Sequence, residues 1–153
     1  MNSEWYLAEL VMRISVEDDP RSVVHQNLVL IRGGSPNEAH EKALQNGKNS
    51  ECSYENAGGK MVQISFEGLS DLDLIHEELE DGAEIAFRYS VDLSEEQIRS
   101  MVRGRDQLRV FLPPKKADGP NYASAEILAL AERELRRGGQ SGGEGGGEGG
   151  QPE

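Results

Sequence analysis

From residue 5 to residue 16, apolar side chains recur at every second position, which is the period of a β-strand. One side of this segment is wholly apolar, whereas the opposite side is only half polar. An element that is apolar on most of both sides is typical of a central strand, because both of its faces then contact other parts of the fold. The apolar side holds Tyr6, Ala8, Leu10, Met12 and Ile14, and the other side holds Trp5, Leu7, Glu9, Val11 and Arg13.

Five more segments have strand character. Residues 23–32 follow the first strand after a short acidic loop, and this proximity favours an antiparallel pair. Residues 61–67 alternate most clearly, with Val62, Ile64 and Phe66 on one side and polar residues on the other, as in a sheet with one solvated face. The remaining predictions are a short strand at 52–55, a strand at 83–91 and a candidate sixth strand at 108–112.

Helix signals occur at four places. Ser35, followed by Pro36, begins a capping box and predicts a helix to about residue 46, with Gly47 just after its end. Helical spacing of leucine and isoleucine favours a short helix at 70–81. A last helix is predicted at 123–137. The other capping box, at residues 94–97, opens a helix whose predicted buried stripe is Ile98, Met101 and Val102.

The strands therefore occur in adjacent pairs and do not alternate strictly with helices. This order predicts an α+β fold with a mainly antiparallel sheet and helices packed on one face. We predict an α+β domain at 1–112, a linker with a C-terminal amphipathic helix at 113–137, and a disordered Gly/Glu-rich tail at 138–153. The tail holds nine glycines and no aliphatic or aromatic residue, so it has nothing to bury.

Charge and cysteine content argue against several functions. The formal net charge of −12 disfavours binding to nucleic acid or to an anionic membrane, because both are negatively charged. Cys52 is the sole cysteine, which excludes an internal disulfide and a thiolate zinc site. The first residues lack a basic, apolar signal segment, so we expect a cytoplasmic protein. We predict no metal and no cofactor.

A series of short motifs gives the chain a resemblance to known proteins. The series opens with Trp5-Tyr6 on an alternating strand, followed by a Glu-Ala…Lys-Ala helix at residues 38–43. A Tyr-x-Asn turn lies at 54–56, and an Asp-Gly-x-Glu segment lies at 81–84. In this order the motifs resemble a bacterial family of domains of unknown function over roughly the first 90 residues. The resemblance implies a small cytosolic bacterial domain and supplies no activity.

Catalytic signatures are weak. The histidines His25, His40 and His76 fall on different predicted elements, without the spacing of a helical metal motif. Cys52 has no nucleophile motif around it, so a structural role is the simpler interpretation. A small hydrolase-like enzyme would need Cys52, His40 or paired carboxylates to converge in the fold.

An acidic run is the most distinctive feature of the chain. Residues 67–84 hold eight acids and no Lys or Arg, whereas residues 99–116 hold six basic residues against one acid. The run is either a solvated helix face or an electrostatic docking surface for a basic partner. The two oppositely charged regions either face each other within the fold or pair between subunits. The candidate partner-binding residues are Asp71, Asp73, Glu77, Glu78, Glu80 and Asp81.

These observations favour a non-catalytic protein-binding domain of accessory, regulatory or immunity type that docks a basic protein. Two alternatives remain open. One is the hydrolase-like enzyme. The other is a structural subunit of an assembly, homo-oligomers included, in which the C-terminal helix offers an apolar face formed by Ile127, Leu128 and Leu135.

Overall fold

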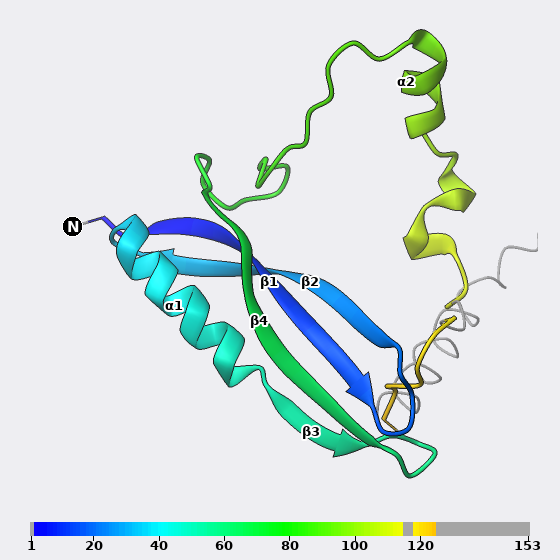
Figure 1. Ribbon diagram of the computed structural model, residues 1–153. Coiled ribbons are helices and arrows are strands. Elements are labelled where there is room, and N and C mark those ends of the chain that lie inside the picture. The colour runs from blue at the N-terminus through cyan, green and yellow to red at the C-terminus, as the bar shows by residue number, and fades with distance from the viewer. Residues whose placement is uncertain (1, 115–117, 125–153) are drawn as a thin grey trace, which may run out of the picture.

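The computed structural model describes residues 2–114 and 118–124 (Figure 1). Within these residues, four strands form one antiparallel sheet in the order β2-β1-β4-β3. This arrangement confirms the predicted α+β fold and antiparallel sheet. The strands are β1 (Glu4–Val16), β2 (Ser22–Gly33), β3 (Cys52–Glu55) and β4 (Met61–Leu74). The helical elements are α1 (Pro36–Asn49), α2 (Glu95–Met101), and the 3₁₀ turns η1 (Arg105–Gln107) and η2 (Arg109–Phe111).

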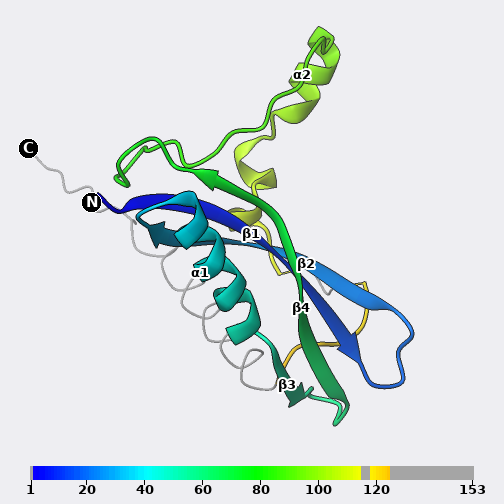
Figure 2. The same ribbon diagram turned by 60° about the vertical axis from the view of Figure 1, so that its left-hand side comes forward.

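The predicted central strand, β1, is confirmed, because it pairs along nearly its whole length with β2 on one side and β4 on the other. Its wholly apolar side forms the core under α1, which lies across one face of the sheet in both views (Figures 1 and 2). Two register shifts between β1 and β4 interrupt the ladder, and irregularities of this kind increase strand twist. The core residues are Tyr6, Ala8, Leu10, Met12, Ile31, Ala39 and Ala43.

Helix α1 begins as predicted and ends later than predicted. The Ser35 side chain accepts a hydrogen bond from the N–H of Glu38, and the Glu38 carboxylate accepts one from the N–H of Gly34 at 2.8 Å. The helix then continues to Asn49, so the expectation that Gly47 follows the helix is wrong. Gly47 instead lies in the last turns, against the ring of Phe66 on β4. The close approach of the helix to the sheet at this point requires a residue without a side chain.

The helix predicted at 70–81 does not form. Residues 70–74 continue β4, where Leu72 lies opposite Ala8 and Leu74 opposite Tyr6 on the core side of β1. The long apolar side of β1 offers pairing and burial to these leucines, which a short isolated helix would not provide. After β4, Ile75 is buried and its N–H donates to the carbonyl of Trp5 at 2.9 Å.

Residues 83–112, here called the arm, leave the sheet after the acidic loop and run outside it (Figure 1). The strands predicted at 83–91 and 108–112 are absent, and the second segment contains η2 instead. A strand needs a neighbour for its backbone, and the arm has none among the described residues of its own chain. The alternating side chains of Phe87 and Tyr89 are 73% and 81% exposed.

Helix α2 lies within the arm and begins with the predicted capping box between Ser94 and Gln97. Its stripe of apolar residues was expected to be buried, and that expectation is wrong: Ile98, Met101 and Val102 are all exposed. The local start signal is sufficient to form the helix. Burial of the stripe requires a second surface, which the described residues do not provide.

Residues 118–124, here called the strap, return to the sheet at the end opposite to the start of the arm. Tyr122 packs against the small cluster formed by Ile14, Val16 and Val62. The Asn56 side chain donates to the carbonyl of Asn121 at 2.7 Å. The strap begins within the segment predicted as a linker, and its residues Asn121 and Tyr122 pack on the domain. Residues 125–137 of the predicted last helix, and the tail at 138–153, lie outside the described residues.

The Tyr54 hydroxyl, which donates to the carbonyl of Tyr122, gives the strap a pH dependence. Burial, and then Cys52 and Tyr122, raise the pKa of Tyr54 above its ordinary value of 10.0. The protonated Tyr54 hydroxyl therefore stabilises the packed strap fully at any pH below the pKa that Tyr54 has in the unfolded chain. This stabilisation is lost as the pH rises through the higher pKa that Tyr54 has in the folded protein. We expect amide exchange in the strap, corrected for intrinsic rates, to increase above about pH 10.

The matched control for this prediction is Tyr54→Phe, which keeps the ring and removes the ionisable group. In this variant the strap should exchange faster than in the wild type at neutral pH, and the additional step above about pH 10 should disappear. An unchanged step in Tyr54→Phe would assign the pH dependence to another group.

Candidate functional site

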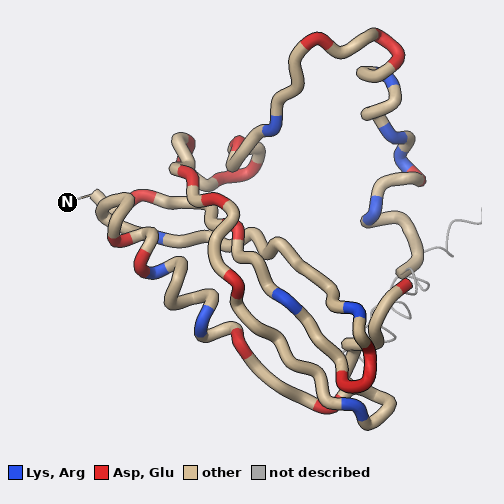
Figure 3. Tube along the Cα trace, viewed as in Figure 1, with Lys and Arg blue, Asp and Glu red and all other residues tan. Residues whose placement is uncertain are grey.

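The acidic run is exposed, and the structure distributes its candidate residues over three places (Figure 3). Asp71 and Asp73 lie on β4, on the side away from α1, because they pair with Glu9 and Leu7 of β1. The next two candidates line a cavity at the start of β1, and the last two lie in the loop that follows. In that order, the six exposed residues are Asp71, Asp73, Glu77, Glu78, Glu80 and Asp81.

Within residues 2–114 and 118–124, none of these six carboxylates forms an ion pair with Lys or Arg. Several accept hydrogen bonds from nearby backbone instead. Asp71 and Asp73 each accept one from the N–H of the following residue at 2.9 Å. Glu77 accepts one from the N–H of Glu84 at 3.0 Å. Adjacent exposed carboxylates repel one another, and a cationic partner would relieve that repulsion.

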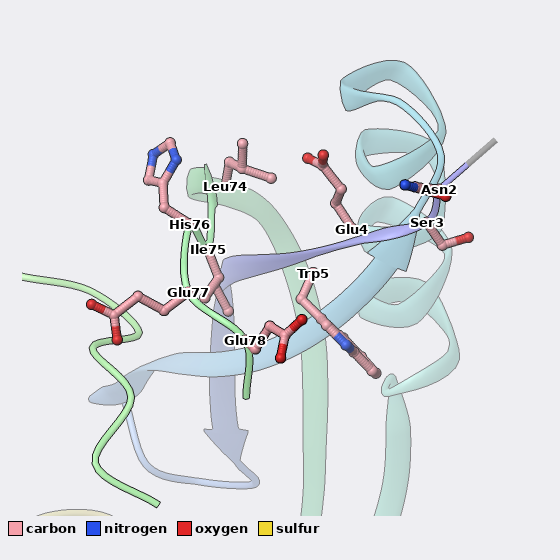
Figure 4. A pocket seen from close by; sticks show the side chains of 9 residues that line it. All are labelled: Asn2, Ser3, Glu4, Trp5, Leu74, Ile75, His76, Glu77 and Glu78. Atoms are coloured by element: carbon pink, nitrogen blue, oxygen red, sulfur yellow. The ribbon is translucent and has the colours of Figure 1, made fainter. Parts of the chain in front are cut away.

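A cavity of about 350 Å³ lies where the start of β1 meets the chain leaving β4 (Figure 4). The buried side chain of Ile75 and its backbone hydrogen bond to Trp5 hold the two segments together. Three carboxylates and one indole belong to the lining, so the cavity combines negative charge with an aromatic surface. The lining residues are Asn2, Ser3, Glu4, Trp5, Leu74, Ile75, His76, Glu77 and Glu78.

Trp5 already contacts one cation of its own chain. The guanidinium carbon of Arg32 on β2 lies 5.6 Å from the centre of its ring. In Figure 4 the Glu78 side chain reaches toward Trp5, whereas His76 and Glu77 point away from it. A carboxylate beside an indole can bind an ammonium or guanidinium group by charge and by the electron-rich ring face. From the sequence, one of Trp5 and Tyr6 was expected in the core, and Tyr6 is the one that is buried. The sequence identified the acids but not the place of Trp5 beside them.

The groups considered for catalysis are not brought together. Cys52 is exposed on β3, and His40 is exposed on α1. His25 lies against Tyr122, with its Nε2 atom 3.3 Å from the tyrosine hydroxyl, while His76 borders the cavity. Among the residues that the structure describes, no group of three or more His, Cys, Asp or Glu side chains is placed to hold a metal ion.

A second surface was not singled out from the sequence. The sheet face opposite α1, here called the open face, carries apolar side chains that no described helix buries. Beside it, a cavity of about 600 Å³ separates β2 from Arg88 and Arg109 of the arm. One sequence feature could have indicated this surface: the side of β1 that faces away from the core is only half polar, which is unusual for a solvated face. Besides Trp5 at its end, the apolar members of the open face are Leu7, Val11, Val24, Leu28 and Leu30.

The basic region of the arm does not pair with the acidic run in the described residues. Arg105 forms an ion pair with the adjacent Asp106 at 3.2 Å and lies over the ring of Phe111 at 4.0 Å. No arginine of the arm forms an ion pair with residues 67–84 in the part that the structure describes. From the sequence, the acidic and basic regions were expected either to face each other within one chain or to pair between subunits. The described residues do not form the pairing within one chain.

Comparison with known proteins places this geometry in a family without an assigned activity. A family model with the description "Domain of unknown function (DUF4288)" matches residues 5–87. The match covers the sheet except Glu4, together with α1 and the acidic run, and it ends within the arm. It includes the cavity lining except Asn2, Ser3 and Glu4. No curated protein and no solved structure matches the chain. None of the described helices has the length and apolar character needed to cross a bilayer.

Proposed function

We propose that this chain, which belongs to the DUF4288 family of domains of unknown function, is a non-catalytic protein-binding domain. Its binding site is the acidic cavity at the start of β1, and its ligand is a basic segment of a partner protein. The observation that carries the proposal is the combination of Glu4, Glu77 and Glu78 with Trp5 around one cavity.

The chemistry of the cavity supports a cationic side chain as the ligand. A Lys or Arg side chain has an apolar stem and a charged end, and it can place the stem along an indole while the end meets a carboxylate. The contact between Arg32 and Trp5 is an example of such packing within the chain. Glu80 and Asp81 lie a few residues farther along the loop and extend the negative surface.

The overall charge also favours a basic partner. A net charge of −12 attracts a cationic segment over a long range, which accelerates encounter and weakens as salt is added. We place the protein in the cytoplasm, since its one cysteine, Cys52, is exposed and unpaired, as is usual in a reducing compartment. The proposed role is accessory or regulatory.

Trp5 is the only tryptophan in the chain, so its fluorescence reports directly on the cavity. We expect an arginine- and lysine-rich peptide to change this fluorescence on titration, and a glutamine-substituted peptide of equal length to leave it unchanged. Raising the ionic strength to about 1 M shortens the screening length to about 3 Å and should weaken binding strongly. A response that is equal for both peptides would contradict the proposal.

Charge reversal at the cavity supplies the second test. We expect Glu77→Lys with Glu78→Lys to weaken binding of the basic peptide by at least about tenfold, or roughly 1.4 kcal/mol. The matched control is Glu95→Lys with Glu96→Lys on α2, which changes the net charge equally but lies away from the cavity. Equal losses in both variants would show that net charge acts without a specific site.

A further inference from the structure

The exposed apolar side chains of this protein are concentrated on the arm. Of the 16 large hydrophobic residues exposed among the described residues, 11 lie between residues 85 and 112, and three more lie on β2. An apolar surface of this extent usually marks an interface, because single exposed residues are common but contiguous patches are not. The three on β2 are Val24, Leu28 and Leu30, and they belong to the open face.

The sequence of the arm has the apolar periodicity of strands and helices that bury one face against another surface. Ile85, Phe87, Tyr89 and Val91 alternate as in a strand, and they are 48% to 81% exposed. Helix α2 presents its exposed stripe farther along the same arm. The arm is anchored by the sheet at its start and by the strap after its end, and it stands away from β2 between them (Figures 1 and 2).

The open face has the complementary properties. Its apolar residues lie on β1 and β2, and β2 is an edge strand whose outer backbone groups pair with no other described strand. On the same face, the positions beside Leu7 and Leu28 hold the acids Glu9, Asp71 and Asp73. Two arginines, Arg13 and Arg32, lie nearer the ends of the face. Such a surface can accept an added strand or an amphipathic helix, and its acids favour a segment that is both apolar and basic.

The second half of the arm is such a segment. Between its apolar residues the whole arm carries five arginines against five acids, and the arginines dominate its second half. Among the described residues of the chain, these arginines make no ion pair with Glu9, Asp71 or Asp73. The five arginines are Arg88, Arg99, Arg103, Arg105 and Arg109.

We propose that the arm of one chain covers the open face of a second copy, and that the second copy returns the same contact. Every chain carries both halves of this interface, so a two-fold dimer satisfies both at once. The arginines then meet the acids of the open face, and the alternating residues of the arm cover Leu28 and Leu30. None of the residues named here for this surface lines the acidic cavity, but Trp5 of the cavity lies on the same side of β1 as Leu7, so the two surfaces adjoin.

The first test is the oligomeric state of the full chain, measured by sedimentation equilibrium over a range of concentrations. We expect a dimer that dissociates on dilution. Phe87→Asp with Tyr89→Asp on the arm, and Leu28→Asp with Leu30→Asp on the open face, should each raise the dissociation constant by about 100-fold or more. The control is Leu79→Asp, an apolar residue outside both surfaces, which should leave it unchanged. Circular dichroism verifies that each variant is folded.

The second test mixes the arm variant with the open-face variant. In the mixed dimer, the intact arm of one chain meets the intact open face of the other, so association should be partly restored. Contact of the arm with its own sheet predicts monomers in every sample. Contact through any other surface predicts no restoration on mixing. A monomeric wild-type chain, or a dimer that persists in both variants, would overturn the proposal.

Discussion

Gly47→Val is expected to lower the free energy of unfolding by about 3 kcal/mol, because the helix and sheet approach each other too closely at this residue for a side chain. A Cβ atom at Gly47 would overlap three carbon atoms of the Phe66 ring, well inside normal contact distance. Phe66 itself packs against the core cluster, so the ring cannot move without disturbing other contacts. Chemical denaturation followed by circular dichroism measures the loss.

Three related variants make the interpretation specific. Gly47→Ala should lose less, about 1 kcal/mol, since the higher helix propensity of alanine offsets part of the cost of the overlap. Gly104→Ala is the control, because Gly104 has a negative φ and a Cβ atom added there would have no other atom within 4 Å. Phe66→Leu should reduce the cost of Gly47→Val in a double-mutant cycle. If the two substitutions are additive, the ring contact is not the cause.

The elements predicted correctly are those whose signals are local. Alternation over 5–16 identified the central strand, and Ser35 and Ser94 identified the starts of both helices. A capping residue acts through its own backbone neighbours, so its effect is independent of the rest of the fold. The antiparallel order of β1 and β2 also followed from a short connection.

The incorrect predictions share a different physical origin. Residues 70–74 extend β4 because β1 is available as a partner, and no local pattern contains that information. The alternation at 83–91 is real, but no strand forms without a neighbour that can accept its hydrogen bonds. The expectation that α1 ends before Gly47 rests on the frequency of glycine just after helices, whereas here glycine is needed for contact with Phe66.

The candidate site was predictable only in part. Composition identified the acids at Glu77 and Glu78, since a run of like charge is visible in any sequence. Their distribution into a cavity, a strand and a loop depends on where β4 ends. The contribution of Trp5 depends on a backbone contact with Ile75, which is distant along the chain, and no sequence pattern reports such a contact.

Leu10→Ala and Leu28→Ala remove the same atoms from opposite faces of the sheet. Leu10 is 1% exposed under α1, so its truncation should cost about 3 kcal/mol of unfolding free energy through lost burial and a residual cavity. Leu28 is 55% exposed on the open face, so in a single chain its truncation should cost at most about 0.5 kcal/mol. Urea denaturation at low protein concentration measures both.

Repeating the measurement at high protein concentration separates the two sites. Association stabilises the folded state by mass action, so the apparent stability of a dimer rises with concentration. The cost of Leu10→Ala should be nearly constant, because its contacts lie within one chain. The cost of Leu28→Ala should grow as the arm of a second copy covers it. A cost for Leu28→Ala that is small at every concentration would mean that the open face stays solvated, and the exposed apolar residues of the arm would then require another partner.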